Sequence, residues 1–244
     1  MSRPRAISLF SGCGGSDLAL ERAGFKIVWS NDIWGVACET NRLNLKSSKI
    51  VEGDIRRFDD FPDAELVVGC YPCQGYSQGG LRDPDAPVNY LYREFDRVLR
   101  MVRPRAFVVE NVNGMAYGKN RVLLNNQVYR YRLAGYRVSW KVLNAKDYGV
   151  AQSRRRIFLV GIRSDIAAIY SFPKPQYGPG TKRSYRSQRE AIAGMPSWPK
   201  GKFCEETLHW YYLSRNRRRP WGKPSPCIVG HWRHVLFSPG LFGH

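Results

Sequence analysis

The sequence predicts an α/β fold, a doubly wound and mostly parallel sheet followed by a small, basic, irregular C-terminal region. Up to about residue 163, short apolar segments alternate with amphipathic ones, which is typical of a parallel sheet covered by helices on both faces. Beyond that point, proline, glycine, serine and basic residues replace the alternation. We therefore expect two domains, a ligand-binding domain over residues 1–163 and a small basic region over residues 164–244.

The first half of the predicted sheet consists of short elements separated by glycine or polar residues. In order they are a strand running into a glycine-rich turn (5–15), a helix ended by glycine (17–24), a strand (25–32), a helix (34–44) and a buried strand (65–70). Consecutive apolar residues in the last of these are what a parallel strand covered on both faces requires.

The second half begins with the most regular helical pattern in the chain. Residues 90–102 place five apolar side chains on one helical face, and Pro104 ends the helix. The remaining expected elements are a strand (106–112), a helix (121–134) and two strands (136–143 and 156–162).

Glycines and polar side chains stand where the predicted strands end. These segments are Gly12–Gly15, Asp32, Pro72–Gln74 and Glu110. Ligands of open parallel sheets bind beyond the carboxyl ends of the strands, so we expect the functional site there.

Charge indicates a polyanionic partner. Lys and Arg number 39 against 20 acidic residues, a net charge of +19, and residues 164–244 hold 13 of these cations but only 4 of the acids. Such an excess favours nucleic acid as the partner over a surface charged only for solubility.

Composition also indicates the cellular compartment. No run of 18 apolar residues occurs and the N-terminus lacks a signal-peptide pattern, so we expect no membrane association. Six cysteines are too few for a disulfide scaffold. A cytoplasmic chain with reduced thiols is the expectation.

The glycine-rich turn and Asp32 together suggest a nucleotide-like cofactor. Glycines allow close backbone approach, and a carboxylate about 20 residues on can accept hydrogen bonds from ribose hydroxyls. Asp17 replaces the last glycine of the dinucleotide pattern, which favours an adenosyl compound, although a simple tight turn would look similar.

Cys70 and Cys73 allow three interpretations. A redox pair normally opens a helix, yet the loop-like QGYSQGG follows, and a zinc site needs four ligands. The other candidate ligands are too scattered for a metal site: Cys204, His209, Cys227 and His231. We expect no metal, a buried Cys70 at a strand end, and a reactive Cys73 thiolate on a loop.

Two further segments carry polar side chains suited to a bound base. Glu110 and Asn111 end an apolar strand, and a carboxyl kept protonated by burial can donate a proton to a base. Gln152, Arg154 and Arg156 alternate, so an extended chain puts them on one face, where they suit phosphate or carbonyl oxygens. The alternative interpretation for each of these residues is a charged side chain that only faces solvent.

Taken in order, these segments resemble the cytosine-C5 DNA methyltransferase family. The matching stretches, which span residues 7–161, are LFSGCGG, SND, GDI, PCQGYS, ENV and QSRRRIFLVG. The resemblance implies a Rossmann-like methyltransferase fold and S-adenosyl-L-methionine as methyl donor, with S-adenosyl-L-homocysteine as product.

The resemblance also assigns roles to single residues. Cys73 would be the nucleophile, with Glu110 and Arg154 as further catalytic residues. The cofactor would contact Phe10, Gly12, Gly14, Asp32, Ile33, Asp54, Ile55 and Pro72. The substrate would contact Gln74, Asn111, Gln152 and Arg156. The implied reaction adds a methyl group to carbon-5 of a flipped cytosine through a covalent Cys73 adduct, in a restriction-modification or phage setting.

Two departures from the family pattern matter. Tyr71 stands where many members carry proline, and nothing after residue 164 matches the family's Gly-Asn-Ala-Val-Pro-like return segment. We therefore expect a truncated member, a fragment, or one half of a split enzyme with a complementing C-terminal subunit. The alternatives are a catalytically incomplete DNA-binding subunit and a tRNA cytosine-C5 methyltransferase.

Overall fold

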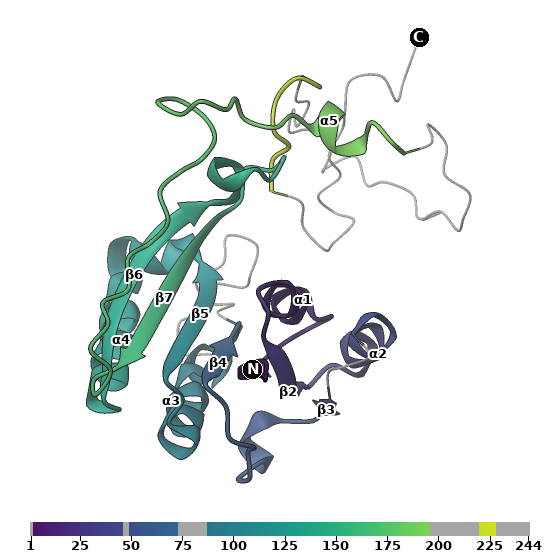
Figure 1. Ribbon diagram of the computed structural model, residues 1–244. Helices are drawn as coiled ribbons and strands as arrows, with labels where there is room; N and C mark the ends of the chain where they lie inside the picture. The colour runs from purple at the N-terminus through teal and green to yellow at the C-terminus, as the bar shows by residue number, and fades with distance from the viewer. Residues whose placement is uncertain (1, 46–48, 73–86, 196–219, 228–244) are drawn as a thin grey trace. The chain divides into compact units, whose positions relative to one another are not determined.

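The computed structural model describes residues 2–45, 49–72, 87–195 and 220–227. The chain forms two compact units, one from residues 1–142 and 156–172 and the other from residues 143–155 and 173–244. The sheet and the large helices of Figure 1 belong chiefly to the first unit. The domain limits expected from the sequence stay a prediction.

Seven strands form one sheet in the order β3-β2-β1-β4-β5-β7-β6. Their bounds are β1 Arg5–Leu9, β2 Lys26–Asp32, β3 Ile50–Glu52, β4 Leu66–Gly69, β5 Ala106–Val112, β6 Tyr136–Asn144 and β7 Arg155–Arg163. Strands β1 to β5 pair in parallel, whereas β7 runs antiparallel to β5. The predicted mostly parallel α/β sheet is confirmed.

The four helices of the first unit lie where the sequence predicts them. The helix bounds are α1 Gly15–Arg22, α2 Gly35–Asn44, α3 Tyr92–Val102, α4 Arg121–Leu133 and, in the second unit, α5 Gln188–Ile192. A short 3₁₀ helix, η1 Ile55–Arg57, follows β3. Neither α5 nor η1 was predicted from the sequence. Among the described residues, no helix has the length and apolar character needed to cross a membrane.

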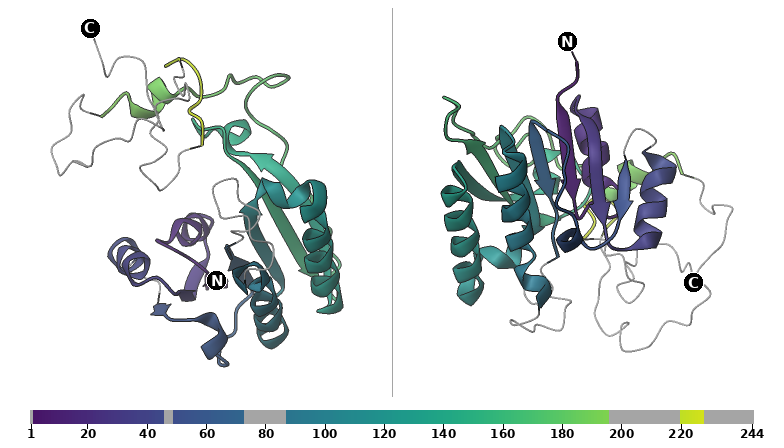
Figure 2. Two further views of the ribbon diagram at one scale, coloured as in Figure 1. Left: turned by 180° about the vertical axis from the view of Figure 1, so that it is seen from behind. Right: turned by 90° about the horizontal axis from the view of Figure 1, so that it is seen from below.

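Strand alternation divides the core into two layers. Ile7, Val67 and Phe107 face α3 and α4, which lie side by side in Figures 1 and 2. Their neighbours Ala6 and Val68 point to the other face and pack with Leu20 of α1. Period-2 alternation thus buries both faces of the central strands, and the core lies on either side of β1 and β4.

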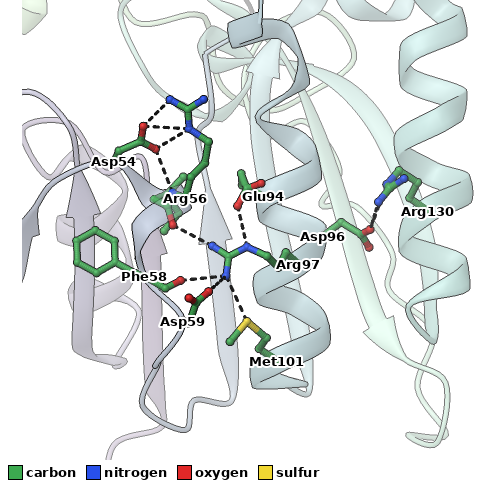
Figure 3. A network of polar contacts seen from close by, with 10 residues as sticks. Asp54, Arg56, Phe58, Asp59, Glu94, Asp96, Arg97, Met101 and Arg130 are labelled. Atoms are coloured by element: carbon green, nitrogen blue, oxygen red, sulfur yellow. Dashed lines mark hydrogen bonds and ion pairs between the residues drawn. The ribbon is translucent and has the colours of Figure 1, made fainter.

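Ion pairs attach α3 to its neighbours on both sides (Figure 3). Arg97 donates to the Ile55 carbonyl and the Phe58 carbonyl, each at 2.9 Å, and binds Glu94 at 2.7 Å. On the same helix, buried Asp96 binds Arg130 of α4 at 2.7 Å. A buried charge such as Asp96 needs such a partner. The hydrogen bonds of partly buried Arg97 fix the segment around η1 against α3.

Replacement of Gly161 tests the packing between β5 and β7. An added Cβ at Gly161 would lie 2.0 Å from Cε1 of Phe107. Overpacking of this kind typically costs 1–3 kcal/mol, so Gly161→Ala should lower the free energy of unfolding by about 2 kcal/mol in urea titrations. Gly15→Ala is the matched control, since its Cβ meets nothing within 4 Å. Equal stability of the two variants would contradict the close packing of Phe107 on Gly161.

Candidate active site

The turn between β1 and α1 depends on left-handed backbone. Phe10 has a φ of 55°, Gly12 of 55° and Gly14 of 90°. A Cβ on Gly14 would lie 2.4 Å from Cδ1 of Leu45, so both conformation and space require glycine there. The turn therefore brings the backbone close to the sheet edge, as the glycine-rich sequence predicts.

Asp32 ends β2 and holds two segments together. Its Oδ2 accepts a hydrogen bond from the Gly12 amide at 2.8 Å, and its Oδ1 accepts one from the Trp34 amide at 2.9 Å. The neighbouring Asn31 donates to the carbonyls of Val51 at 3.0 Å and Gly53 at 2.9 Å. These bonds join the ends of β1, β2 and β3.

A pocket of about 510 Å³ opens at this edge of the sheet. It is lined by Phe10, Asn31, Asp32, Ile33, Trp34, Gly53, Asp54, Ile55, Arg56, Cys70, Pro72 and Leu91. Six of the eight residues expected to bind a cofactor are in this lining, and Gly12 and Gly14 shape the turn beside it. Sequence reasoning missed the other six lining residues, which are Asn31, Trp34, Gly53, Arg56, Cys70 and Leu91. All of them except Leu91 lie within or close to a motif that it identified.

Asp54 is held in its ionised form. Arg56 places its Nε 3.0 Å from both carboxylate oxygens and its Nη2 2.5 Å from Oδ2. These hydrogen bonds lower the pKa of Asp54 to about 2. The Arg56 amide also donates to the carboxylate at 3.0 Å and so begins η1. The pocket wall therefore carries a hydrogen-bond acceptor at any physiological pH.

Cys70 follows β4 and lines the pocket as a neutral thiol. Its amide donates to the Leu9 carbonyl at 3.2 Å. Burial, with a smaller contribution from the charge of Glu110, raises the pKa of Cys70 to about 12. A thiol in this state is a poor nucleophile. Cys73 and Gln74 lie outside the described residues.

Glu110 lies at the carboxyl end of β5 and pairs with Arg156 of β7. The Nε of Arg156 is 3.1 Å from Oε1 of Glu110, because the antiparallel register sets the two strand segments opposite each other. Asn111 is only 4% exposed, and its Nδ2 donates to the Tyr71 carbonyl at 3.0 Å. Contact of Asn111 with a substrate stays a prediction; the structure gives it a role in fixing the backbone at Tyr71.

The other predicted residues belong to the second unit. There Arg154 places its Nη1 3.6 Å from Sγ of Cys227. The Ser153 amide donates to the Ser225 carbonyl at 2.7 Å, and Gln152 forms a β-bridge with Ser225. Within the described part of the chain, the buried Oε1 of Gln152 has no hydrogen-bond partner, and no three His, Cys, Asp or Glu side chains cluster as metal ligands would.

Alkylation can test the state of the Cys70 thiol. Since its pKa is raised to about 12, its thiolate fraction at pH 8 is on the order of one in ten thousand. We expect iodoacetamide at pH 8 to modify exposed Cys13 and to leave Cys70 unmodified, as measured by peptide mass spectrometry. Both should react in urea, and equal rates in the folded protein would contradict the buried, neutral state.

Comparison with known proteins places this geometry in a family. The family described as C-5 cytosine-specific DNA methylase matches residues 5–215. Type II methyltransferase M.NgoPII of Neisseria gonorrhoeae is 40% identical over 96% of this chain and 74% of its own length. Type II methyltransferase M.BsuRI of Bacillus subtilis is 36% identical over 96% of this chain, which spans only 60% of that protein.

A solved methyltransferase structure has a similar fold. The structure of the S. pombe Dnmt2 methyltransferase matches with a TM-score of 0.68 and 20% identity, over 96% of this chain and 73% of that one. This likeness supports the fold. The family match over residues 5–215 and the identity to the type II enzymes show that the chain belongs to the C-5 cytosine-specific DNA methylase family.

Proposed function

We propose that this chain is a DNA cytosine-C5 methyltransferase of the restriction-modification or phage type. It transfers a methyl group from S-adenosyl-L-methionine to carbon-5 of a cytosine flipped out of double-stranded DNA. The observation that carries this is the pocket at the carboxyl ends of β1, β2 and β4, whose wall includes Cys70 and Pro72 on either side of Tyr71. The next residue after Pro72 is Cys73.

The pocket residues fit an adenosyl group. Asp32 and Asp54 offer carboxylate oxygens to hydroxyl and amino donors, and Phe10, Ile33 and Leu91 offer apolar surface to a flat ring. A volume of about 510 Å³ lies within the usual range for small-molecule sites. When bound, S-adenosyl-L-methionine supplies an electrophilic methyl group, and the pocket orients it at the sheet edge.

The chain's own residues supply the remaining chemistry. Carbon-5 of cytosine is a weak nucleophile, so the Cys73 thiolate adds to carbon-6 and the electron pair moves into the ring. Glu110 in its protonated form donates a hydrogen bond to N3 and so stabilises the negative charge that develops there, and Arg156 orients the Glu110 carboxyl group. After methylation, a base removes the carbon-5 proton and the sulfur leaves carbon-6. Gln74, Gln152 and Arg154 are proposed to hold the base and the adjoining backbone.

DNA is the proposed macromolecular partner. A net charge of +19 favours the phosphate backbone, and carbon-6 is accessible to a thiolate only when the base leaves the stack. Because the chain spans 60% of the Bacillus subtilis relative, a complementing C-terminal subunit is also proposed. The proposed location is the cytoplasm, in association with DNA.

A covalent trap tests the nucleophile. A duplex containing 5-fluorocytosine cannot lose its carbon-5 substituent as a proton, so the sulfur adduct should persist in the presence of the methyl donor. We expect a denaturation-resistant protein–DNA complex for the wild-type chain and none for Cys73→Ser. Cys70→Ser is the matched control and should still form it. An adduct with Cys73→Ser would defeat the assignment.

Calorimetry with S-adenosyl-L-homocysteine tests the cofactor site. Asp32→Ala removes the acceptor proposed for the ribose hydroxyls and a hydrogen bond to the Gly12 amide, so affinity should fall by tenfold or more, since bonds to charged groups are worth about 1.5–3 kcal/mol. Asp63→Ala, which lies outside the pocket lining, is the control. Unchanged affinity of the folded Asp32→Ala variant would contradict the proposed site.

A further inference from the structure

We propose that Tyr71 is a positioning residue, which anchors the start of the segment that carries Cys73 to helix α4 through its phenolic hydroxyl. The inference rests on the proposed function of Cys73. It arises from a departure in the sequence, since Tyr71 stands where many members of the family carry proline. The structure shows contacts of the tyrosine side chain that a proline could not make.

The hydroxyl of Tyr71 belongs to a closed, buried network. Tyr71 is 3% exposed, and its hydroxyl lies 2.6 Å from Oε1 of Gln127 and 3.0 Å from the hydroxyl of Tyr131. An amide oxygen can only accept, so Tyr71 donates to Gln127 and Tyr131 donates to Tyr71. Both partners are on α4 and are fully buried. Loss of any member would leave a buried polar atom without its partner.

The rest of Tyr71 touches the other parts of the site. Its ring packs edge-on against Phe10, with centroids 6.0 Å apart, and lies tilted against Phe95 of α3, with centroids 5.8 Å apart. Its carbonyl accepts a hydrogen bond from Asn111 at 3.0 Å, next to Glu110. One residue therefore connects the turn after β1, the end of β4, the end of β5 and helix α4.

The position of Tyr71 affects that of Cys73 because Cys73 is only two residues further along the chain. Two residues span at most about 7 Å, so the position of Tyr71 limits where the Cys73 sulfur can reach. A proline at position 71 would restrict the backbone there through its ring, which fixes φ. Tyrosine leaves φ free. Here the hydrogen bonds of the buried Tyr71 hydroxyl and the hydrogen bond from Asn111 to the Tyr71 carbonyl restrict the backbone instead.

Tyr71→Phe removes only the hydroxyl and is the test. We expect single-turnover methyl transfer to a cytosine-containing duplex to slow about fivefold, because one net hydrogen bond is worth about 1 kcal/mol. The dissociation constant for S-adenosyl-L-homocysteine should change less than about twofold, since the ring stays against Phe10. Gln127→Met should give the same loss, and the double variant should not be additive.

Tyr136→Phe is the matched control. Tyr136 is also buried, and its hydroxyl donates to the Pro104 carbonyl at 2.9 Å, before β5 begins and away from the pocket lining. A loss of stability with unchanged transfer is expected for this variant. Equal slowing in both variants, or wild-type transfer by folded Tyr71→Phe, would overturn the proposal.

Hydrogen exchange gives a readout that does not require activity. The Cys70 amide is bonded to the Leu9 carbonyl, and its exchange should be at least several-fold faster in Tyr71→Phe and unchanged in Tyr136→Phe. Unchanged exchange in Tyr71→Phe would overturn the anchor. If the wild-type chain transfers no methyl group, alone or with a complementing subunit, the proposed function fails, and the exchange comparison still decides the role of Tyr71.

Discussion

Strand β1 pairs in parallel with β2 on one side and β4 on the other, and the pocket residues at the ends of these three strands depend on this pairing. Leu9 lies opposite both Asn31 and Gly69. The residues that follow these three positions, Phe10, Asp32 and Cys70, therefore leave the sheet at one level and line one pocket. A slip of one residue in either pairing would turn the neighbouring side chains to the opposite face and separate them.

The site places specific donors beside each carboxylate, although the chain as a whole is strongly basic. Asp32 accepts from two backbone amides, Asp54 from the guanidinium of Arg56, and Glu110 from that of Arg156. The arginines hold the last two carboxylates in position, and amides do so for the first, so each acid keeps a defined direction. The pocket thus presents oriented acceptors next to a thiol, Cys70, that stays neutral.

Local patterns in the sequence predicted the elements, while non-local contacts had to come from the structure. Local sequence patterns were sufficient for α1 to α4 and most strands, but β3, with three residues, and α5, with five, are too short to give a pattern. The antiparallel β7 between β5 and β6 depends on pairing between distant segments. Motifs identified six of the twelve pocket residues, yet they could not show that Asn111 binds the Tyr71 backbone or that Tyr71 bonds Gln127, which lies 56 residues away.

Buried polar side chains at the carboxyl edge explain how the pocket keeps its shape. Beyond the last paired residues, strand ends leave backbone groups that the sheet no longer satisfies. Asn31 of β2 donates to the carbonyl of Val51 in the edge strand β3 and to that of Gly53 just after it, and Asn111 donates to the Tyr71 carbonyl beyond β4. Apolar replacements would leave these groups unpaired, at about 1–3 kcal/mol each. Because these bonds form within the protein, the wall is ordered before a ligand arrives, and binding loses less conformational entropy than it would in a flexible loop.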